Sequence, residues 1–242
     1  MDKKVLVIVV TCNGMRWMDR TLGSLRKSSV PVNVLVVDNA SIDSTPEYVA
    51  SAFPEAEVIS LDLDRGYAAA CNMGLQIMLE RHYTHAVLLD QYCSVEKDTI
   101  ERLCRAWREG YGLMSPELVS ASGGLFRPYG RMCGKKVGEM TRTFNKDNLV
   151  VDVPRVPAGL WMVSREALET VGLLSVGPDK YDTVRDYVGR LASGGLGIAI
   201  VPAAVCACNP AEDEGEIAKA YRSSFSALHN LRERFGLRKK NV

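Results

Sequence analysis

Three apolar runs that end in polar residues constrain the fold of this 242-residue chain most strongly. Val34–Val37 is an uninterrupted aliphatic run that stops at Asp38, and similar runs end at Thr11 and at Asp90. Such runs are typical of strands that a sheet buries on both faces. Because open α/β sheets bind ligands beyond the carboxyl ends of their strands, the three ends predict one nucleotide site on one rim of the sheet.

Segments with helical character lie between these runs. Apolar residues recur at helical spacing from Trp17 to Leu25, and residues 67–80 are rich in Ala, Leu and Met. Ser44 is suited to cap one further helix, and Ser94 to cap another. This alternation with short connections predicts a single α/β domain with a mostly parallel central sheet flanked by helices.

The second half of the chain is less regular. Residues 121–148 contain five glycines and several bases, which fit either an ordered hairpin or a mobile flap. Beyond them we expect extended chain over 152–163, a helix from Ser164 to Gly172, a helix over 179–191, a strand over 195–201 and a final amphipathic helix over 212–234. We therefore expect one domain over 1–242, with a nucleotide-binding half (1–120) and an acceptor-side half with the C-terminal helix (121–242).

Charge and composition exclude several classes of partner. Lys+Arg 30 against Asp+Glu 29 gives a net charge of +1, which predicts no nucleic-acid partner. No apolar stretch reaches the ~20 residues of a membrane span, although the basic tail leaves peripheral association with an anionic membrane surface open. The seven cysteines indicate buried thiols in a reducing cytoplasm. We therefore expect a cytoplasmic protein, and the basic tail leaves a position at the inner membrane surface open. Cys206-x-Cys208 lacks identifiable metal-binding partners in the sequence.

Four motifs, taken in order and spacing, carry a family resemblance. They are VIVVTCNG (7–14), VLVVDNASIDST (34–45), LDRGYAAACNMGL (63–75) and VLLDQY (87–92). Together they resemble the family 2 glycosyltransferases of GT-A fold, and the Asp-Gln of the last motif is most similar to the rhamnosyltransferase-like branch. The resemblance returns between residues 156 and 201. It implies a single GT-A-like domain.

The resemblance also implies roles for residues on the predicted rim. Asp38 would accept a hydrogen bond from a pyrimidine imide, although an Asp at this point also fits an Asx turn that starts the loop. Asp90 matches the first position of the family's Asp-x-Asp element and would contact ribose or a metal-bound water. The other residues assigned to the nucleotide are Thr11, Asn13, Gly14, Arg65 and Gly66, for which strand-end and surface turns are the alternative interpretation.

The metal position departs from the family pattern. The family implies Mn²⁺ or Mg²⁺ bound against the diphosphate, and Asp90 would be the ligand that this chain retains. The third position of the element, normally an Asp ligand, is Tyr92. A phenol with a pKa near 10 is a poor ligand for a hard cation.

The catalytic-base position departs as well. The family's Glu-Asp pair falls on Thr183 and Val184, and its His after the last strand falls near Cys208. The nearest carboxylates are Asp182 and Asp186, four residues apart and so on one helix face. We expect one of them, with Asp182 favoured, to deprotonate the acceptor.

Two functions remain open from the sequence. The chain is either an inverting transferase, which moves a sugar from a UDP- or dTDP-linked donor to a glycan, lipid-linked or polysaccharide acceptor, or a catalytically impaired nucleotide-binding or assembly module. In the first case, Arg65 and the bases within 127–136 would stabilise the leaving diphosphate in place of a metal. A nucleotidyltransferase ranks lower, because the chain lacks a Gly-rich, Lys-ended phosphate loop.

Overall fold

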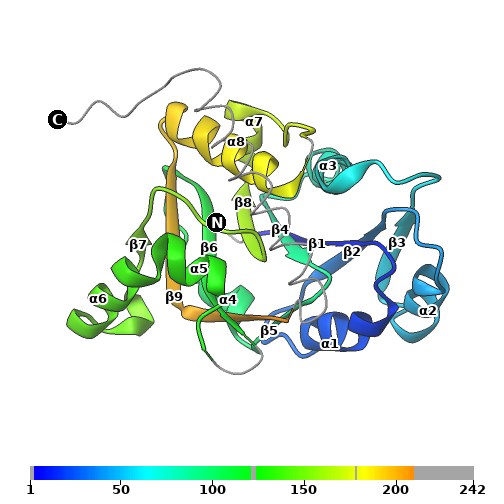
Figure 1. The fold of residues 1–242 in the computed structure, drawn as a ribbon, viewed down its shortest axis with the longest axis horizontal. Coiled ribbons are helices and arrows are strands. Elements are labelled where there is room, and N and C mark those ends of the chain that lie inside the picture. The colour runs from blue at the N-terminus through cyan, green and yellow to red at the C-terminus, as the bar shows by residue number, and fades with distance from the viewer. Residues whose placement is uncertain (1–2, 121–123, 178, 210–242) are drawn as a thin grey trace, which may run out of the picture. The chain divides into compact units, whose positions relative to one another are not determined.

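The structure is a computed structural model, and it describes residues 3–120, 124–177 and 179–209 (Figure 1). Residues 1–209 belong to one compact unit. The helix predicted over 212–234 lies outside the described residues. Within the described part of the chain, no helix combines the length and the apolar character needed to cross a membrane.

A mixed, largely parallel sheet forms the centre of the unit. Its order is β3-β2-β1-β4-β8-β6-β9-β5, and β7 also pairs with β9. The strands are β1 (Val5–Thr11), β2 (Asn33–Asp38), β3 (Ala56–Ser60), β4 (His85–Asp90), β5 (Cys93–Val95), β6 (Tyr111–Ser120), β7 (Val151–Asp152), β8 (Leu160–Ser164) and β9 (Gly197–Cys208). The β3-β2-β1-β4 half is parallel throughout, as predicted, whereas β8 runs antiparallel to both of its neighbours.

Helices cover both faces of this sheet. Figure 1 shows α1 and α2 on one side, with α3, α7 and α8 on the other. The helices are α1 (Met15–Arg26), α2 (Thr45–Ala52), α3 (Gly66–Glu80), α4 (Thr99–Ala106), α5 (Arg127–Tyr129), α6 (Lys135–Thr143), α7 (Arg165–Val171) and α8 (Lys180–Ser193). A π-helical segment, η1 (Gly130–Gly134), joins α5 to α6, and a 3₁₀ turn, η2 (Lys146–Asn148), follows α6. The α/β class predicted from the sequence is confirmed.

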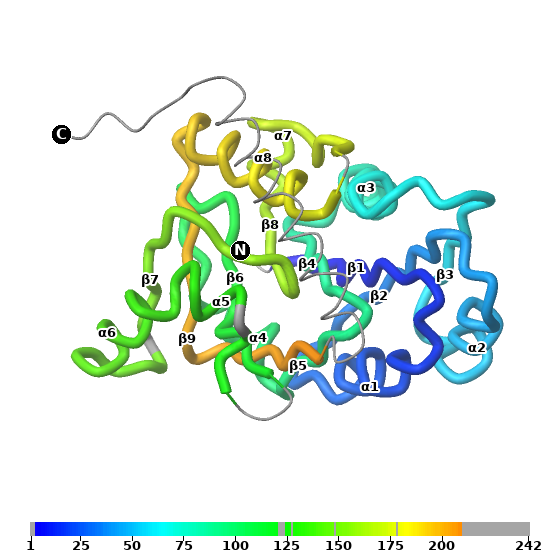
Figure 2. Tube along the Cα trace, viewed as in Figure 1, coloured from blue at the N-terminus to red at the C-terminus, as the bar shows by residue number. Residues whose placement is uncertain are grey.

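Two local predictions are wrong. The described part of the 121–148 stretch is mainly helical, from α5 to α6, and does not form the ordered hairpin that was one of its two predicted forms (Figure 2). Ser94 does not cap a helix, because Cys93 and Val95 on either side of it are buried as strand β5 against β9. Asp98 instead occupies the N-cap of α4. The predicted cap at Ser164 is confirmed, since its side chain accepts a hydrogen bond from the Ala167 N–H.

Strand register places the three polar strand ends side by side. Thr11 of β1 is paired with Asp38 of β2, and Val10 is paired with Asp90 of β4. The strands on both sides of β1 therefore end within one residue of the end of β1 itself. All three polar residues are at most 3% exposed. The rim predicted from the sequence thus exists as one continuous polar edge.

Candidate active site

A cavity of about 220 Å³ opens at this edge. Its lining is formed by Val10, Thr11, Cys12, Asn39, Asp64, Gly66, Tyr67, Asp90, Gln91, Tyr92 and Lys180. Ligand pockets usually measure about 300–1,000 Å³, so this cavity has room for only part of a ligand as large as a nucleotide sugar. Two larger hollows lie elsewhere, one beside α1 and β2 and one between α4 and the segment around Asp147. Neither of them is at the carboxyl ends of β1, β2 and β4.

Gln91 connects the ends of β1 and β4. Its side-chain oxygen accepts hydrogen bonds from the Thr11 hydroxyl at 2.8 Å and from the Cys12 N–H at 2.9 Å. Gly14 permits this arrangement, because a Cβ at that position would lie 2.1 Å from Thr11 Oγ1 and 2.6 Å from Gln91 Oε1. The Gly14 N–H instead donates to the Thr45 hydroxyl at 3.0 Å. Gly14 therefore acts by shaping the loop rather than by lining the cavity.

Asp38 holds the loop that follows β2. Its carboxylate accepts hydrogen bonds from the hydroxyl and, at 3.2 Å, from the N–H of Ser41. This is the turn that the sequence offered as an alternative to nucleotide binding. Ser41 in turn accepts from the Asn13 N–H at 2.8 Å, and Asn13 Oδ1 accepts from the Ile42 N–H at 2.9 Å. Asp38 and Asn13 thus fix the loops beyond the cavity wall, and a carboxylate retains lone pairs for a further donor.

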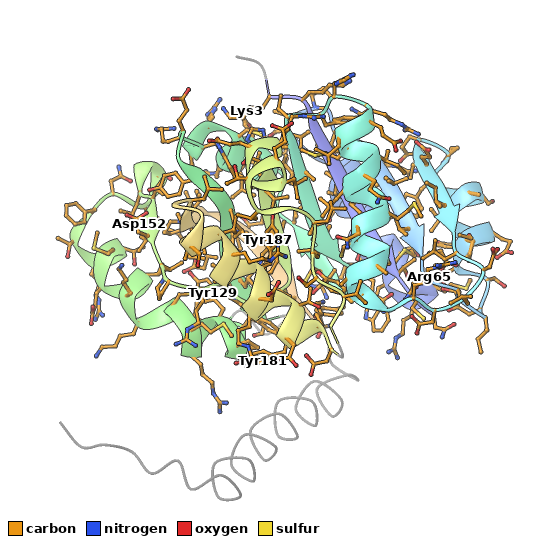
Figure 3. All side chains as sticks on the ribbon, turned by 90° about the horizontal axis from the view of Figure 1, so that it is seen from above. Lys3, Arg65, Tyr129, Asp152, Tyr181 and Tyr187 are labelled. Atoms are coloured by element: carbon orange, nitrogen blue, oxygen red, sulfur yellow. The ribbon has the colours of Figure 1, made fainter. Side chains whose placement is uncertain are left out.

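The predicted Arg-Gly loop is bound to the rim through its backbone. Asn39 accepts from the Arg65 N–H at 3.0 Å and donates to the Asp64 carboxylate, which also accepts from the Gly66 N–H at 2.8 Å. Gly66 has a φ of +78°, a conformation that glycine adopts without strain, and it starts α3. The side chain of Arg65 is exposed at the start of α3 (Figure 3). Gly66 therefore lines the cavity, whereas Arg65 does not.

Lys180, the first residue of α8, brings a cation into the cavity. Its ammonium lies 2.5 Å from Asp90 Oδ2, and the carboxylate is only 3% exposed. The same nitrogen is 4.2 Å from the centre of the Tyr67 ring and 5.5 Å from that of Tyr92, in the range of cation–π attraction. The Tyr92 hydroxyl donates to Asp90 Oδ2 at 2.9 Å. Sequence reasoning missed Lys180, because nothing in its local motif distinguishes it from a surface lysine.

This arrangement does not fit the divalent ion that the family resemblance implies. Asp90 already bonds Lys180 and Tyr92. Burial raises the pKa of the Tyr92 phenol well above its usual value, and the negative charge of Asp90 raises it further, so this oxygen stays protonated. Mn²⁺ and Mg²⁺ prefer ionised or carbonyl oxygen ligands. The ammonium of Lys180 lies against Asp90, where the family would place the metal ion.

The two carboxylates predicted as bases lie further along α8. Asp186 accepts hydrogen bonds from the Ser175 hydroxyl at 2.7 Å and from Arg190 Nε at 2.8 Å. These bonds, above all the one from Ser175, keep the pKa of Asp186 below its usual value. Asp182 forms an ion pair with Arg185 at 2.7 Å and keeps 30% of its side chain exposed. Neither carboxylate lines the cavity.

The residues at the family's base positions point into the protein. Thr183 and Val184 are 2% and 6% exposed, and the Thr183 hydroxyl donates to backbone carbonyls at Ser175 and Asp179. Of the bases predicted to assist within 127–136, Arg131, Lys135 and Lys136 do not line the cavity either, and the side chain of Arg127 lies outside the described part of the structure. Among the described residues, Lys180 is the cation that lines this cavity.

Comparison with known proteins identifies the family. The model described as Glycosyl transferase family 2 matches residues 6–172, which include every strand from β2 to β8. The chain belongs to this glycosyltransferase family. The family prediction is therefore confirmed.

Two individual relatives are similar to this chain at low sequence identity. Undecaprenyl-phosphate mannosyltransferase of Micrococcus luteus is 26% identical, over 82% of this chain and 82% of the relative. Polyprenol monophosphomannose synthase of Mycolicibacterium smegmatis is 27% identical, over 83% of this chain and 76% of the relative. Both are described as mannose enzymes, so these comparisons support the family and not the rhamnosyltransferase-like branch.

A solved structure confirms the fold. The mannosyltransferase PcManGT of Pyrobaculum calidifontis, in complex with GDP-Man and Mn²⁺, matches with a TM-score of 0.61 and 24% identity. The match covers 86% of this chain but 57% of the PcManGT chain, so the present chain spans little more than half of that protein. At this identity the match establishes the GT-A-like architecture alone.

Proposed function

We propose that this glycosyltransferase transfers a hexosyl group, with inversion, from a nucleoside diphosphate sugar to a lipid-linked phosphate acceptor, and that it does so without a divalent metal. The observation that carries the proposal is the cluster of Lys180, Asp90 and Tyr92 at the carboxyl end of β4. The donor would lie along the rim, with its nucleoside toward the loops of Asp38 and Asn13 and its diphosphate toward Lys180.

Lys180 supplies the charge that the leaving diphosphate requires. As the anomeric carbon–oxygen bond breaks, the electron pair stays on the diphosphate oxygen, and negative charge builds up there. An ammonium has three N–H donors, and one interaction with Asp90 leaves others for phosphate oxygens. Lys180 also stands in the first turn of α8, where the positive end of the helix dipole favours an anion. Arg65, the exposed neighbour of Gly66 in the chain, would be a second cation available to the diphosphate.

A phosphate acceptor would account for the absence of a carboxylate at the family's catalytic-base position. A hydroxyl acceptor must lose a proton as it attacks the anomeric carbon, which calls for a positioned base. A phosphate monoester has a second pKa near 6, so at neutral pH its oxygen is already an anionic nucleophile. Thr183 and Val184 in place of the family's Glu-Asp pair are therefore compatible with a phosphate acceptor. The names of both polyprenyl-phosphate relatives point in the same direction.

The nucleobase and the sugar of the donor can be determined with a panel of nucleotide sugars. The rim was predicted to bind a pyrimidine nucleotide, UDP- or dTDP-linked, whereas the PcManGT complex holds GDP-Man. The related names favour mannose over rhamnose as the transferred sugar. Donor panels should therefore include GDP-, UDP- and dTDP-sugars.

One experiment separates the two acceptor classes. With a short-chain polyprenyl phosphate as acceptor, Asp182→Asn should leave turnover close to that of the unmodified chain. With a glycan hydroxyl as acceptor, the same variant should lose on the order of 100-fold, because base catalysis is worth about that much. Asp186→Asn serves as the matched control on the same helix face. A large loss in Asp182→Asn with the phosphate acceptor would refute the base-free route, and a loss confined to Asp186→Asn would transfer the role of base to that residue.

The alternative is the impaired nucleotide-binding or assembly module. The buried Thr183 and Val184 favour it, since they replace the carboxylates on which family catalysis depends. Nucleotide binding without consumption of any donor, across donors and both acceptor classes, would support the module and refute transfer.

A further inference from the structure

Three cysteine side chains meet where the short strand β5 pairs with the end of β9. The Sγ atoms of Cys93, Cys206 and Cys208 all lie within 4.8 Å of one another, and all three residues are buried. Cys93 is paired with Cys208 across the antiparallel ladder, and Cys206 is two positions earlier on β9, so the three share one face. No partner for Cys206-x-Cys208 could be identified from the sequence, and the pairing of β5 with β9 brings Cys93 to it.

The ladder brings two of these thiols together without any movement of the strands. The Asn209 N–H donates to the Tyr92 carbonyl at 3.0 Å, which makes that neighbouring pair hydrogen-bonded. Pairs alternate along an antiparallel ladder, so Cys93 and Cys208 form a non-hydrogen-bonded pair. Side chains approach each other most closely in such pairs. The cluster is therefore set by the backbone rather than by adjustable side chains.

The chemistry of three sulfurs points to one class of ligand. A metal–sulfur bond of about 2.3 Å places three sulfurs around one ion up to about 4 Å apart, so the observed cluster needs shifts of about 1 Å or less. Thiolates select soft cations over the hard ions that bind carboxylates.

We propose that Cys93, Cys206 and Cys208 bind one thiophilic d¹⁰ cation through their three sulfurs, as a structural site that ties β5 to β9. Each thiol gives its proton to solvent as its metal–sulfur bond forms, and no oxidation state changes. The group that the described residues form contains no histidine or carboxylate as a fourth ligand. Cu⁺, which accepts three sulfurs, therefore fits better than Zn²⁺, which in structural sites takes four protein ligands.

Cys93 of the cluster lies close in the chain to Asp90 and Tyr92 of the candidate site. Strand β5 is three residues long, and it begins three residues after Asp90. A Cβ placed on Gly159 would lie 3.1 Å from Cys208 Sγ, and the Gly159 carbonyl accepts a hydrogen bond from the Asp90 N–H at 3.0 Å. An ion at the cluster would therefore hold the segment that carries Asp90 and Tyr92. The inference stands on this geometry alone and does not depend on which sugar, if any, is transferred.

The test is a metal titration of the full chain, reduced and stripped with a chelator. Cu⁺ should bind under competition with a Cu⁺ chelator, and Cd²⁺ should produce a thiolate charge-transfer band, each at one ion per chain, whereas Zn²⁺ should bind more weakly. Cys206→Ser should weaken Cd²⁺ binding by at least about 100-fold, since loss of an outer-shell partner alone costs 10–100-fold. Cys133→Ser, which removes a buried cysteine of η1 outside the cluster, should bind as the unmodified chain does.

Three results would overturn the proposal. One is a triple variant, Cys93→Ser/Cys206→Ser/Cys208→Ser, that binds Cu⁺ and Cd²⁺ as tightly as the unmodified chain does. Another is a stable Cys93–Cys208 disulfide, found by mass spectrometry in chain purified without oxidant. If Cys206→Ser does not fold, X-ray absorption of the loaded, unmodified chain decides: sulfur neighbours at about 2.3 Å support the site, and nitrogen or oxygen neighbours alone refute it.

Discussion

Removing the charge of Lys180 should weaken binding of a nucleoside diphosphate by roughly 10- to 100-fold. Lys180→Met keeps the length of the side chain and removes the ammonium that lies 2.5 Å from Asp90. A hydrogen bond to a charged group contributes about 1.5–3 kcal/mol, and each 1.4 kcal/mol is a factor of about ten in Kd. Because 30% of the Lys180 side chain is exposed to solvent, the expected loss of affinity is smaller than it would be for a fully buried ammonium.

Calorimetric titration of GDP and UDP into each variant measures this loss. Lys180→Arg keeps the charge and should retain most of the affinity, and Lys27→Met, at an exposed lysine beyond the end of α1, is the matched control. Since Lys180→Met leaves Asp90 buried without its cation, circular dichroism should confirm folding, and Asp90→Asn/Lys180→Met removes both charges if the single variant is unstable. A Kd for Lys180→Met equal to that of Lys27→Met would refute the role given to Lys180.

Three further outcomes test the rim and its surroundings. Asp38→Ala should weaken nucleoside diphosphate binding by roughly tenfold or more. Ser41→Ala removes the hydroxyl bond to Asp38 but keeps the backbone N–H bond and the carboxylate, so it should have little effect; equal losses would make Asp38 purely structural. Mn²⁺ should raise nucleotide affinity in Tyr92→Asp and not in the unmodified chain, and an equal gain in both would show that other ligands complete a metal site. Burial lowers the pKa of His85 from 6.5 to about 4, so the neutral ring stabilises the fold above pH 6.5 and this contribution is lost as the pH falls toward 4. Urea unfolding should show about 2 kcal/mol less stability at pH 5 than at pH 7, and a drop of the same size in His85→Gln would contradict the assignment.

The sequence predicted the first half of the fold well because local patterns determine it. Aliphatic runs that end in Thr11, Asp38 and Asp90 need both faces buried, and parallel pairing then aligns their ends without further information. The pairings of β5 and β7 with β9 were not predictable, because each joins short segments that are far apart in the chain. For the same reason, the contact of Cys93 with Cys206 could not be predicted from the sequence.

The candidate site was predicted in outline and missed at its centre. Motif positions identified Asp90 and the substitution at Tyr92, since both lie within one short stretch. Lys180 lies ninety residues further on, and only the packing of the first turn of α8 against the cavity reveals what it meets. Conversely, Asp38 and Asn13 lie where the rim was predicted, and their observed bonds are to loops, which a sequence pattern cannot distinguish from bonds to a ligand.

The measurement that tests the central claim most directly is donor turnover in the presence of a strong chelator. The full chain, incubated with GDP-mannose and other nucleotide sugars and a short-chain polyprenyl phosphate, should form glycosyl lipid at the same rate with EDTA as with Mn²⁺. Lys180→Met should lose most of that rate while Lys27→Met retains it. Turnover that appears only when Mn²⁺ is added, or that survives unchanged in Lys180→Met, would contradict the account.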